Sequence, residues 1–401
     1  MRKPKLRFQG YTDDWEQRKL GEIADKVSEK NKNNEFSEPF TNSAEQGIIS
    51  QKEYFDREIV NNENLNGYYI VKNDDFIYNP RISVTAPVGP INRNRLGRNG
   101  VMSPLYTVFR THDIDNLYLE FYFKTTKWHR FMKLNGDSGA RFDRFTISST
   151  QFMEMPIPYP TLDEQIKIGE YFDNLDHLIT LHQRKCEETK KLKKYMLQKM
   201  FPKKGMTVPE IRFDGFTDDW EQRKLGSLLN ETREKTKVEN EDTLLSCAID
   251  GMYLNSELFS HFRGSSNIGY LKVKKNDLIL SAQNLHLGNC NVNLRFEHGI
   301  ISPAYKVYEF VDCDPLFMQA WVKQDSTKKF FLKASTEGAS VCRKNIVWDE
   351  LYKQTLPIPK LKEQEKIGQY FNNLDHLITL HQRKCEELQK LKKFMLQNMF
   401  V

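Results

Sequence analysis

The hydrophobic pattern of residues 164–201 predicts one long helix with a coiled-coil seam. Apolar and small polar residues recur there at alternating spacings of four and three, which keeps one helix face against a partner helix. The seam is apolar at both ends and polar in the middle. It consists of Ile168, Phe172, Leu175, Ile179, His182, Cys186, Thr189, Lys193, Met196 and Met200.

The same seam returns in residues 363–400. A helix and its copy, related by a pseudo-twofold axis, are expected to pack antiparallel, with His182 and His381 near the centre. Polar seam residues fix the register of such a pair at some cost in stability. The second seam consists of Ile367, Phe371, Leu374, Ile378, His381, Cys385, Leu388, Lys392, Met395 and Met399.

The chain is an internal repeat of which these helices are one part. Residues 164–201 and 363–400 are identical at 31 of 38 positions, and residues 4–21 return, slightly changed, at 209–226. The segments between them, about 22–163 and 227–362, share only sparse marks in the same order. Self-similarity at this period indicates two copies of one unit. We therefore expect one fold that presents two different surfaces.

The two middle segments have the pattern of an α+β domain. Short runs rich in β-branched and aromatic residues, such as 67–79 and 269–281, alternate with turns of Gly, Asn and Pro. One helix is predicted in each middle, at 116–134 and 315–334. A further short helix is predicted after residue 12, where Asp13 followed by Glu16 resembles a capping box.

Composition and charge narrow the class of protein. The 401 residues contain no apolar run of the roughly 20 residues that a membrane helix needs, and the first ten lack the apolar stretch of a secretory signal. A cytoplasmic location is therefore expected, without a membrane partner. The net charge of +6 permits a nucleic-acid partner but does not demand one.

Metal, cofactor and catalytic sites are not expected on this chain. The six cysteines form no C-x-x-C pair, and the seam position of His182 and His381, beside Cys186 and Cys385, is explained by packing. Neither a G-x-G-x-x-G nor a G-x-x-x-x-G-K-[ST] motif is present, and residues 78–81 lack the second Pro and the aromatic of a methyltransferase motif. The sequence thus predicts a noncatalytic protein.

Residues suited to reading DNA lie in the divergent middles. Residues 79–100 interleave arginines with asparagines, and residues 281–293 are rich in amides. Arg pairs bidentately with guanine, and Asn or Gln pairs with adenine. Such segments are also typical of ordinary polar loops, and the basic run at 181–194 is either a solvated helix face or a phosphate contact. The candidate DNA contacts are Arg81, Arg95, Arg98, Arg144, Arg263, Gln283, Asn284 and Arg343.

The layout resembles the specificity subunit of type I restriction-modification systems. The resemblance covers essentially the whole chain and rests on ordered marks, although the second opening departs at "LGSLL". The marks are Trp15 with Leu20–Ile23, "SPLY" at 103–106, "SPAY" at 302–305, and the "PIP" runs 156–176 and 357–375 that lead into the long helices.

This resemblance implies a fold and a division of labour. Two pseudo-twofold-related α/β target-recognition domains, 1–163 and 205–362, would each read one half of a bipartite double-stranded DNA site. Helices 164–204 and 363–401 would form the antiparallel coiled coil between them, set the spacing and dock partners. Two methyltransferase (modification) subunits and two restriction (endonuclease and translocase) subunits would carry S-adenosylmethionine, ATP and Mg²⁺, with no cofactor on this chain.

Two other classes of function remain open from the residues alone. One is a coiled-coil scaffold that joins protein partners without touching DNA. The other is a split or degenerate methyltransferase, which the missing cofactor motif weakens.

Overall fold

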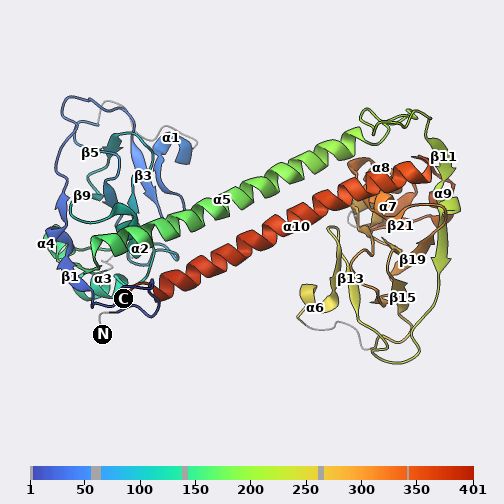
Figure 1. Ribbon diagram of the computed structural model, residues 1–401. Helices are drawn as coiled ribbons and strands as arrows, with labels where there is room; N and C mark the ends of the chain where they lie inside the picture. The colour runs from blue at the N-terminus through green and yellow to red at the C-terminus, as the bar shows by residue number, and fades with distance from the viewer. Residues whose placement is uncertain (1–2, 56–64, 138–142, 261–265, 341–342) are drawn as a thin grey trace. The chain divides into compact units, whose positions relative to one another are not determined.

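The computed structural model divides into two compact units (Figure 1). Unit 1 comprises Met1–His182 with Lys384–Val401, and unit 2 comprises Gln183–Arg383. The structure describes residues 3–55, 65–137, 143–260, 266–340 and 343–401, and for residues 337–340 and 343 the backbone alone. Each unit therefore combines one divergent middle with one end of each long helix.

Unit 1 is built around a four-stranded antiparallel sheet of order β2-β9-β6-β7, with three further antiparallel strand pairs. The sheet strands are β2 (Ala24–Lys26), β9 (Thr107–Thr111), β6 (Phe76–Tyr78) and β7 (Ile91–Arg93). The pairs are β5 (Tyr69–Val71) with β8 (Gly100–Met102), β3 (Phe40–Ser43) with β4 (Gly47–Ser50), and β1 (Glu16–Lys19) with β10 (Pro156–Tyr159). The helices are η1 (Leu20–Glu22), α1 (Gln51–Tyr54), α2 (Asn116–Phe123), α3 (His129–Asn135) and α4 (Ser149–Met153).

Unit 2 repeats this arrangement, with a sheet of order β12-β19-β16-β17, and has one strand pair more, β20 with β21. Its sheet strands are β12 (Leu229–Thr232), β19 (Tyr305–Phe310), β16 (Leu278–Ser281) and β17 (Cys290–Val292). The pairs are β15 (Leu271–Lys274) with β18 (His298–Ile301), β13 (Leu245–Cys247) with β14 (Met252–Leu254), β11 (Glu221–Lys224) with β22 (Thr355–Ile358), and β20 (Ser335–Ser340) with β21 (Arg343–Ile346). The helices are η3 (Leu225–Leu228), η4 (Leu285–Leu287), α6 (Asn255–Leu258), α7 (Pro315–Val322), α8 (Asp325–Lys333) and α9 (Trp348–Lys353).

The register of the central strands is also the same in both units. Ile77 of β6 lies opposite Val108 of β9, and Ile279 of β16 lies opposite Val307 of β19. Because register decides which side chains face the core, equal register places equivalent positions on the same face. The predicted α+β fold with one frame and two different surfaces is confirmed.

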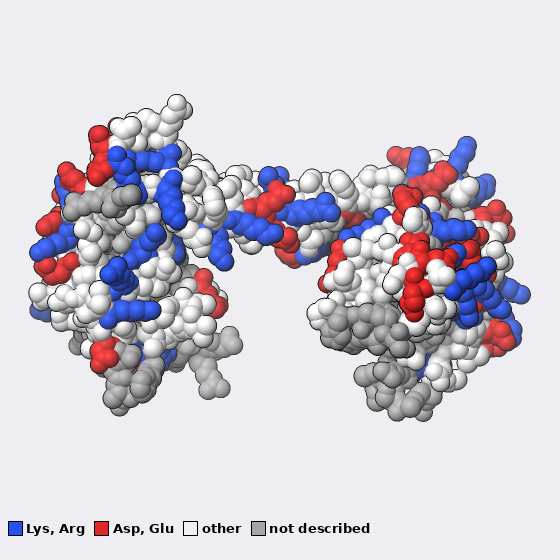
Figure 2. Space-filling view, turned by 90° about the horizontal axis from the view of Figure 1, so that it is seen from below, with Lys and Arg blue, Asp and Glu red and all other residues white. Residues whose placement is uncertain are grey.

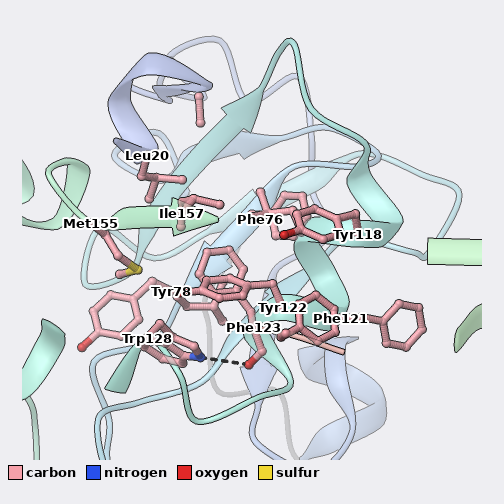
Figure 3. Close-up of a cluster of buried hydrophobic side chains, with 14 of the residues drawn as sticks. Leu20, Phe76, Tyr78, Tyr118, Phe121, Tyr122, Phe123, Trp128, Met155 and Ile157 are labelled. Atoms are coloured by element: carbon pink, nitrogen blue, oxygen red, sulfur yellow. Dashed lines mark hydrogen bonds between the residues drawn. The ribbon is translucent and has the colours of Figure 1, made fainter. Parts of the chain in front are cut away.

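An aromatic core joins the sheet of unit 1 to its helices (Figure 3). Phe76 and Phe109 stack at 5.4 Å between ring centroids, and Phe121 of α2 contacts Phe172 of the long helix at 5.2 Å. The Trp128 indole N–H donates to the Phe123 carbonyl at 3.2 Å, so the polar atom of this buried ring is satisfied. The core thus fixes α2 and α3 against the sheet.

The helices predicted at 116–134 and 315–334 are each broken into two. In unit 1 the Thr125 hydroxyl donates to the Tyr122 carbonyl, and the Trp128 indole N–H donates to the Phe123 carbonyl. In unit 2 the Thr327 hydroxyl donates to the Trp321 carbonyl at 2.6 Å. Side-chain donors thus form hydrogen bonds to carbonyls in the last turn of α2 and α7. Because these carbonyls are satisfied without a further helical turn, both helices end there.

The prediction of a short helix that begins near Asp13 and Glu16 is wrong, because these residues lead into a strand. Glu16–Lys19 forms strand β1, which pairs with β10 so that Glu16 lies opposite Tyr159. A cap contributes only about 1 kcal/mol, and the strand pairing with its flanking core contacts outweighs it. The expected apolar anchors are correct, since Trp15 and Leu20 are buried on either side of the strand.

The two long helices, α5 (Leu162–Lys199) and α10 (Leu361–Asn398), pack antiparallel in each unit. In unit 1 Lys392 pairs with Asp176, and in unit 2 the equivalent Lys193 pairs with Asp375. The Cys186 thiol also lies near the Ile378 carbonyl in unit 2. All predicted seam positions, His182 and His381 included, are buried or partly buried. The predicted antiparallel pairing is confirmed at both helix ends.

A buried carboxylate occupies the same place in both units, with opposite surroundings. Asp75 and Asp277 each accept a backbone N–H, from Lys72 and Lys274, at 2.7 Å. Asp75 is also held by Arg110 at 2.7 and 2.8 Å. Asp277 has no such arginine among the described residues. Burial and, to a smaller extent, Glu309 raise its pKa to about 6, against the backbone hydrogen bond, which lowers it.

We expect the substitution Asp277→Asn to stabilise unit 2 at pH 7. The folded chain binds the Asp277 proton more tightly than the unfolded chain, so stability is lost as the pH rises from about 4 to 6. Asparagine keeps the acceptor and removes this loss, a gain of about 1 to 2 kcal/mol after allowance for solvent screening. Urea unfolding at pH 7 and pH 4 measures it, with little gain expected at pH 4. The control Asp75→Asn should destabilise; a pH-independent gain for Asp277→Asn would contradict this explanation.

Candidate nucleic-acid interface

Two of the predicted DNA contacts in unit 1 lie side by side at one end of the sheet. Arg81 follows β6 by three residues and forms an isolated antiparallel bridge with Arg144. Both side chains are exposed. The nearest carboxylate of Arg144 is Asp143, at 4.0 Å, and Arg81 has no ion pair within the described part of the chain. The two guanidinium groups therefore keep most of their hydrogen-bonding capacity for a ligand.

The backbone around Arg81 is held in place by its neighbours. The Asn79 side chain accepts a hydrogen bond from the Arg81 N–H at 2.9 Å and donates to the Asn42 carbonyl at 2.8 Å. Phe145 N–H donates to the Pro80 carbonyl at 2.7 Å. An asparagine that bonds the backbone two residues on fixes a turn. Arg81 and Arg144 thus project from a preorganised edge, which lowers the ordering cost of binding.

Arg95 and Arg98 are not part of this edge pair, because both are engaged within unit 1. Arg98 binds Glu38 through two hydrogen bonds of 2.8 Å, and this contact lowers the pKa of Glu38. Arg95 bridges Glu120 of α2, at 2.8 Å, and Asp173 of α5, at 2.7 Å. To bind DNA, either arginine would have to break its ion pair with a carboxylate of unit 1. Their DNA contact stays a prediction, and the geometry favours Arg81 and Arg144 over them.

Unit 2 presents its candidates at the equivalent end of the sheet. Gln283 and Asn284 follow β16, and the Gln283 carbonyl accepts the Lys344 N–H of β21 at 3.3 Å. Arg343 begins β21, which places its backbone beside Gln283. Arg263 lies outside the described residues. The structure therefore brings Gln283, Asn284 and the start of β21 together, as it does Arg81 and Arg144.

Two lysines at this end of unit 2, Lys306 and Lys344, were not predicted from the sequence. Lys306 lies opposite Leu280 of β16 and places its ammonium 4.4 Å from the centroid of the partly exposed Trp348 ring. Lys344 lies near His286, whose pKa is lowered by burial and by this lysine. The alternation of apolar and polar residues along β19 indicates that Lys306 faces away from the core, and this pattern is visible in the sequence. The clusters of Arg, Asn and Gln elsewhere are a stronger signal for DNA contact.

Charge is spread over the surface. Figure 2 shows Lys and Arg prominent on the visible face of unit 1, whereas on unit 2 they are interspersed with Asp and Glu. Exposed charge pairs of mixed sign contribute little field beyond a Debye length of about 8 to 10 Å. If the sheet ends contact DNA as predicted, individual side chains there would contribute more to binding than a broad basic patch.

Possible metal ligands and free cysteine thiols lie in both units of the chain. Among residues 3–55, 65–137, 143–260, 266–340 and 343–401, no group of three or more His, Cys, Asp or Glu is placed to hold a metal ion. Burial raises the pKa of the Cys247 thiol to about 11 and that of Cys290 to about 12, so both are protonated at neutral pH. In the same described ranges, no helix has the length and apolar character needed to cross a bilayer.

Both repeats of the chain are similar to a known protein family. Residues 12–191 and 217–390 each match the family described as "Type I restriction modification DNA specificity domain". The MjaX specificity subunit of a type I restriction enzyme from Methanocaldococcus jannaschii is 24% identical over 268 residues, which cover 62% of this chain and 59% of that protein. The MjaVIII specificity subunit of the same organism is 23% identical over 319 residues, 74% of this chain and 73% of that protein.

The fold has a counterpart among solved structures. A type I restriction-modification S subunit from M. genitalium aligns with a TM-score of 0.59 and 13% identity, over 100% of this chain and 99% of the other. At this identity the likeness concerns the fold alone. The family match covers well over half of the residues, with one copy for each repeat. The chain is therefore a member of the family of type I restriction-modification DNA specificity proteins, and it carries two copies of the family's domain.

Proposed function

We propose that this chain is the specificity subunit of a type I restriction-modification system, in which each unit reads one half of a bipartite DNA site. One observation carries this proposal: equal strand order and register present different side chains at the same end of the sheet. Unit 1 offers Arg81 and Arg144 there, and unit 2 offers Gln283 and Asn284. Arginine suits guanine and amides suit adenine, so one frame can read two different half-sites.

The long helices supply equivalent surfaces for two copies of one partner. Four exposed apolar positions occur in both copies: Leu162 with Leu361, Leu178 with Leu377, Leu192 with Leu391, and Tyr195 with Phe394. Repeated exposed apolar residues suit a protein interface. We assign them to two methyltransferase subunits, with the helices setting the half-site spacing. Restriction subunits would join this complex, S-adenosylmethionine, ATP and Mg²⁺ would bind to the partners, and this chain would be noncatalytic.

A scaffold that never contacts DNA is not favoured, because both repeats match a DNA specificity domain. A gel-shift titration of DNA with this chain, with and without the methyltransferase subunits, distinguishes the specificity subunit from the scaffold. The proposal predicts sequence-preferring binding whose affinity falls steeply with salt. The scaffold gains if no such binding appears in either condition, and the enzyme alternative requires methyl transfer by this chain alone.

We expect Arg81→Ala or Arg144→Ala to weaken DNA binding by about 1 to 3 kcal/mol. If the side chain reads a base, preference at one position is relaxed; if it binds a phosphate, all sequences lose affinity alike and the salt slope flattens. Binding profiles on randomised duplexes measure both effects. Arg18→Ala, on strand β1 in the repeated segment 4–21 and outside the divergent middle, is the matched control. Wild-type profiles for both edge variants would place the DNA face of unit 1 elsewhere.

A further inference from the structure

The connection between β6 and β7 contains a tight turn beside the Arg81 and Arg144 edge. Ser83 N–H donates to the Ala86 carbonyl at 3.0 Å, and Ala86 N–H donates back to the Ser83 carbonyl at 3.2 Å. The Ser83 hydroxyl accepts from the same Ala86 N–H at 3.1 Å and lies 3.1 Å from the Thr85 hydroxyl. Backbone and side chains thus close the turn from both ends.

Both ends of this turn are anchored in unit 1. Ile82 packs against the core, and its N–H donates to the Asp143 carbonyl at 3.1 Å. On the other side Val88 is fully buried, and its carbonyl accepts the Tyr78 hydroxyl at 2.9 Å. Gly89 has a φ of +83°, and a Cβ there would lie 2.1 Å from the Asn79 carbonyl oxygen. The turn is therefore held rigidly in one position.

Val84 stands at the tip of this rigid turn with its side chain in solvent. Its relative exposure is 101%, the highest among the exposed large hydrophobic residues of the described chain. Ile82 and Val88, in the same connection, face the core instead. A single exposed valine is ordinary on a protein surface. This one lies three residues from Arg81, on a turn that costs little to order on binding.

We propose that Val84 contacts the C5-methyl group of a thymine in the half-site read by unit 1. This inference rests on the proposed function. The major groove exposes one apolar group among its base edges, the thymine methyl, and it is read by apolar side chains. Val84 has no donor or acceptor in its side chain, and the flanking Ser83 and Thr85 hydroxyls engage each other. Beside Arg81, Val84 adds an apolar contact to a polar edge.

The inference is confined to unit 1. In unit 2 the connection from β16 to β17 contains η4, where Leu287 is 43% exposed. The closed turn of Ser83–Ala86 is thus replaced by a short helix. A thymine contact of this kind would differ between the two half-sites, as expected for two units that read different sequences.

Deoxyuridine lacks only the methyl group of thymine, so it tests the contact from the DNA side. Once the preferred duplex is mapped, each thymine of the unit 1 half-site is replaced singly by deoxyuridine. We expect one replacement to weaken binding of the full chain, with its methyltransferase partners, by about fourfold, which corresponds to about 0.8 kcal/mol for one buried methyl-sized group. Val84→Ala should also cost about fourfold on the thymine duplex, because it removes the same contact.

The decisive result is the double-mutant cycle. Val84→Ala should cost little or nothing on the duplex that already carries deoxyuridine at that position. Leu6→Ala, an exposed apolar residue of unit 1 in the repeated segment 4–21, is the control and should leave both affinities unchanged. Equal losses for Val84→Ala on both duplexes, or no loss on either, overturn the inference. Sequence-specific binding by the wild-type chain would leave the proposed function intact in either case.

Discussion

A chain in which residues 22–163 replace residues 227–362 is expected to recognise a site with the same base sequence in both halves. The exchange joins the new middle to nearly identical flanks, 4–21 in place of 209–226 and 164–201 in place of 363–400. Contacts across these junctions are also equivalent. Asp115 N–H donates to the Gln165 side chain at 2.9 Å, and Asp314 N–H donates to that of Gln364 at 2.9 Å.

The aromatic contacts at these junctions support the same expectation. Tyr118 packs against Phe400 at 5.5 Å in unit 1, and Phe317 packs against Phe201 at 5.4 Å in unit 2. The transplanted middle therefore finds its partners in the new place. Sites bound or methylated by the exchanged chain measure the outcome, and the reciprocal exchange is the control. A chain that folds but keeps both original half-sites would show that the middles do not carry specificity.

The substitution Glu164→Ala is expected to destabilise unit 1 by about 3 to 5 kcal/mol. Arg7 binds this fully buried carboxylate at 2.6 and 2.8 Å, and the Trp15 indole N–H donates to it at 3.1 Å. Removing it leaves a largely buried cation and a buried donor unpaired, which is the costly way to break an ion pair. Since domains are stable by only about 5 to 15 kcal/mol, the loss is large.

Urea unfolding curves measure this loss, with Glu170→Ala, an exposed glutamate of α5, as the control. Unit 2 offers a comparison, because Arg212 binds Glu363 at 2.6 and 2.7 Å whereas the Trp220 indole N–H has no partner among the described residues. Glu363→Ala should therefore cost less than Glu164→Ala. Equal costs for Glu164→Ala and Glu170→Ala would mean that the buried pair does not stabilise the unit.

Much of the fold could be predicted because its signals are local and repeated. The heptad seam of residues 164–201 persists over several turns, and the strands within 269–281 follow from alternating apolar residues. The breaks after Phe123 and Val322 could not be predicted, since they depend on where Trp128 and Thr327 donate. The strand at Glu16–Lys19 depends on β10, about 140 residues further along the chain.

The sequence predicted which residue types the candidate site contains, but it did not predict which of these residues form ion pairs within the protein. Arg95 and Arg98 suggested DNA contacts by composition, but their carboxylates lie far away in sequence: Glu38 is 60 positions from Arg98, and Asp173 is 78 from Arg95. Arg81 and Arg144 meet only through a bridge that no local pattern reveals. Val84 gave no signal in sequence, because an apolar residue is normally assigned to the core.

The central claim, that two different units read two halves of one site, is tested most directly by selecting bound duplexes from a randomised pool. The wild-type chain, with its methyltransferase partners, is predicted to enrich two unlike specified blocks separated by a fixed number of unspecified base pairs. Arg81→Ala should change one block and leave the other as it was. A single uninterrupted motif, two identical blocks, or no enrichment would contradict the claim.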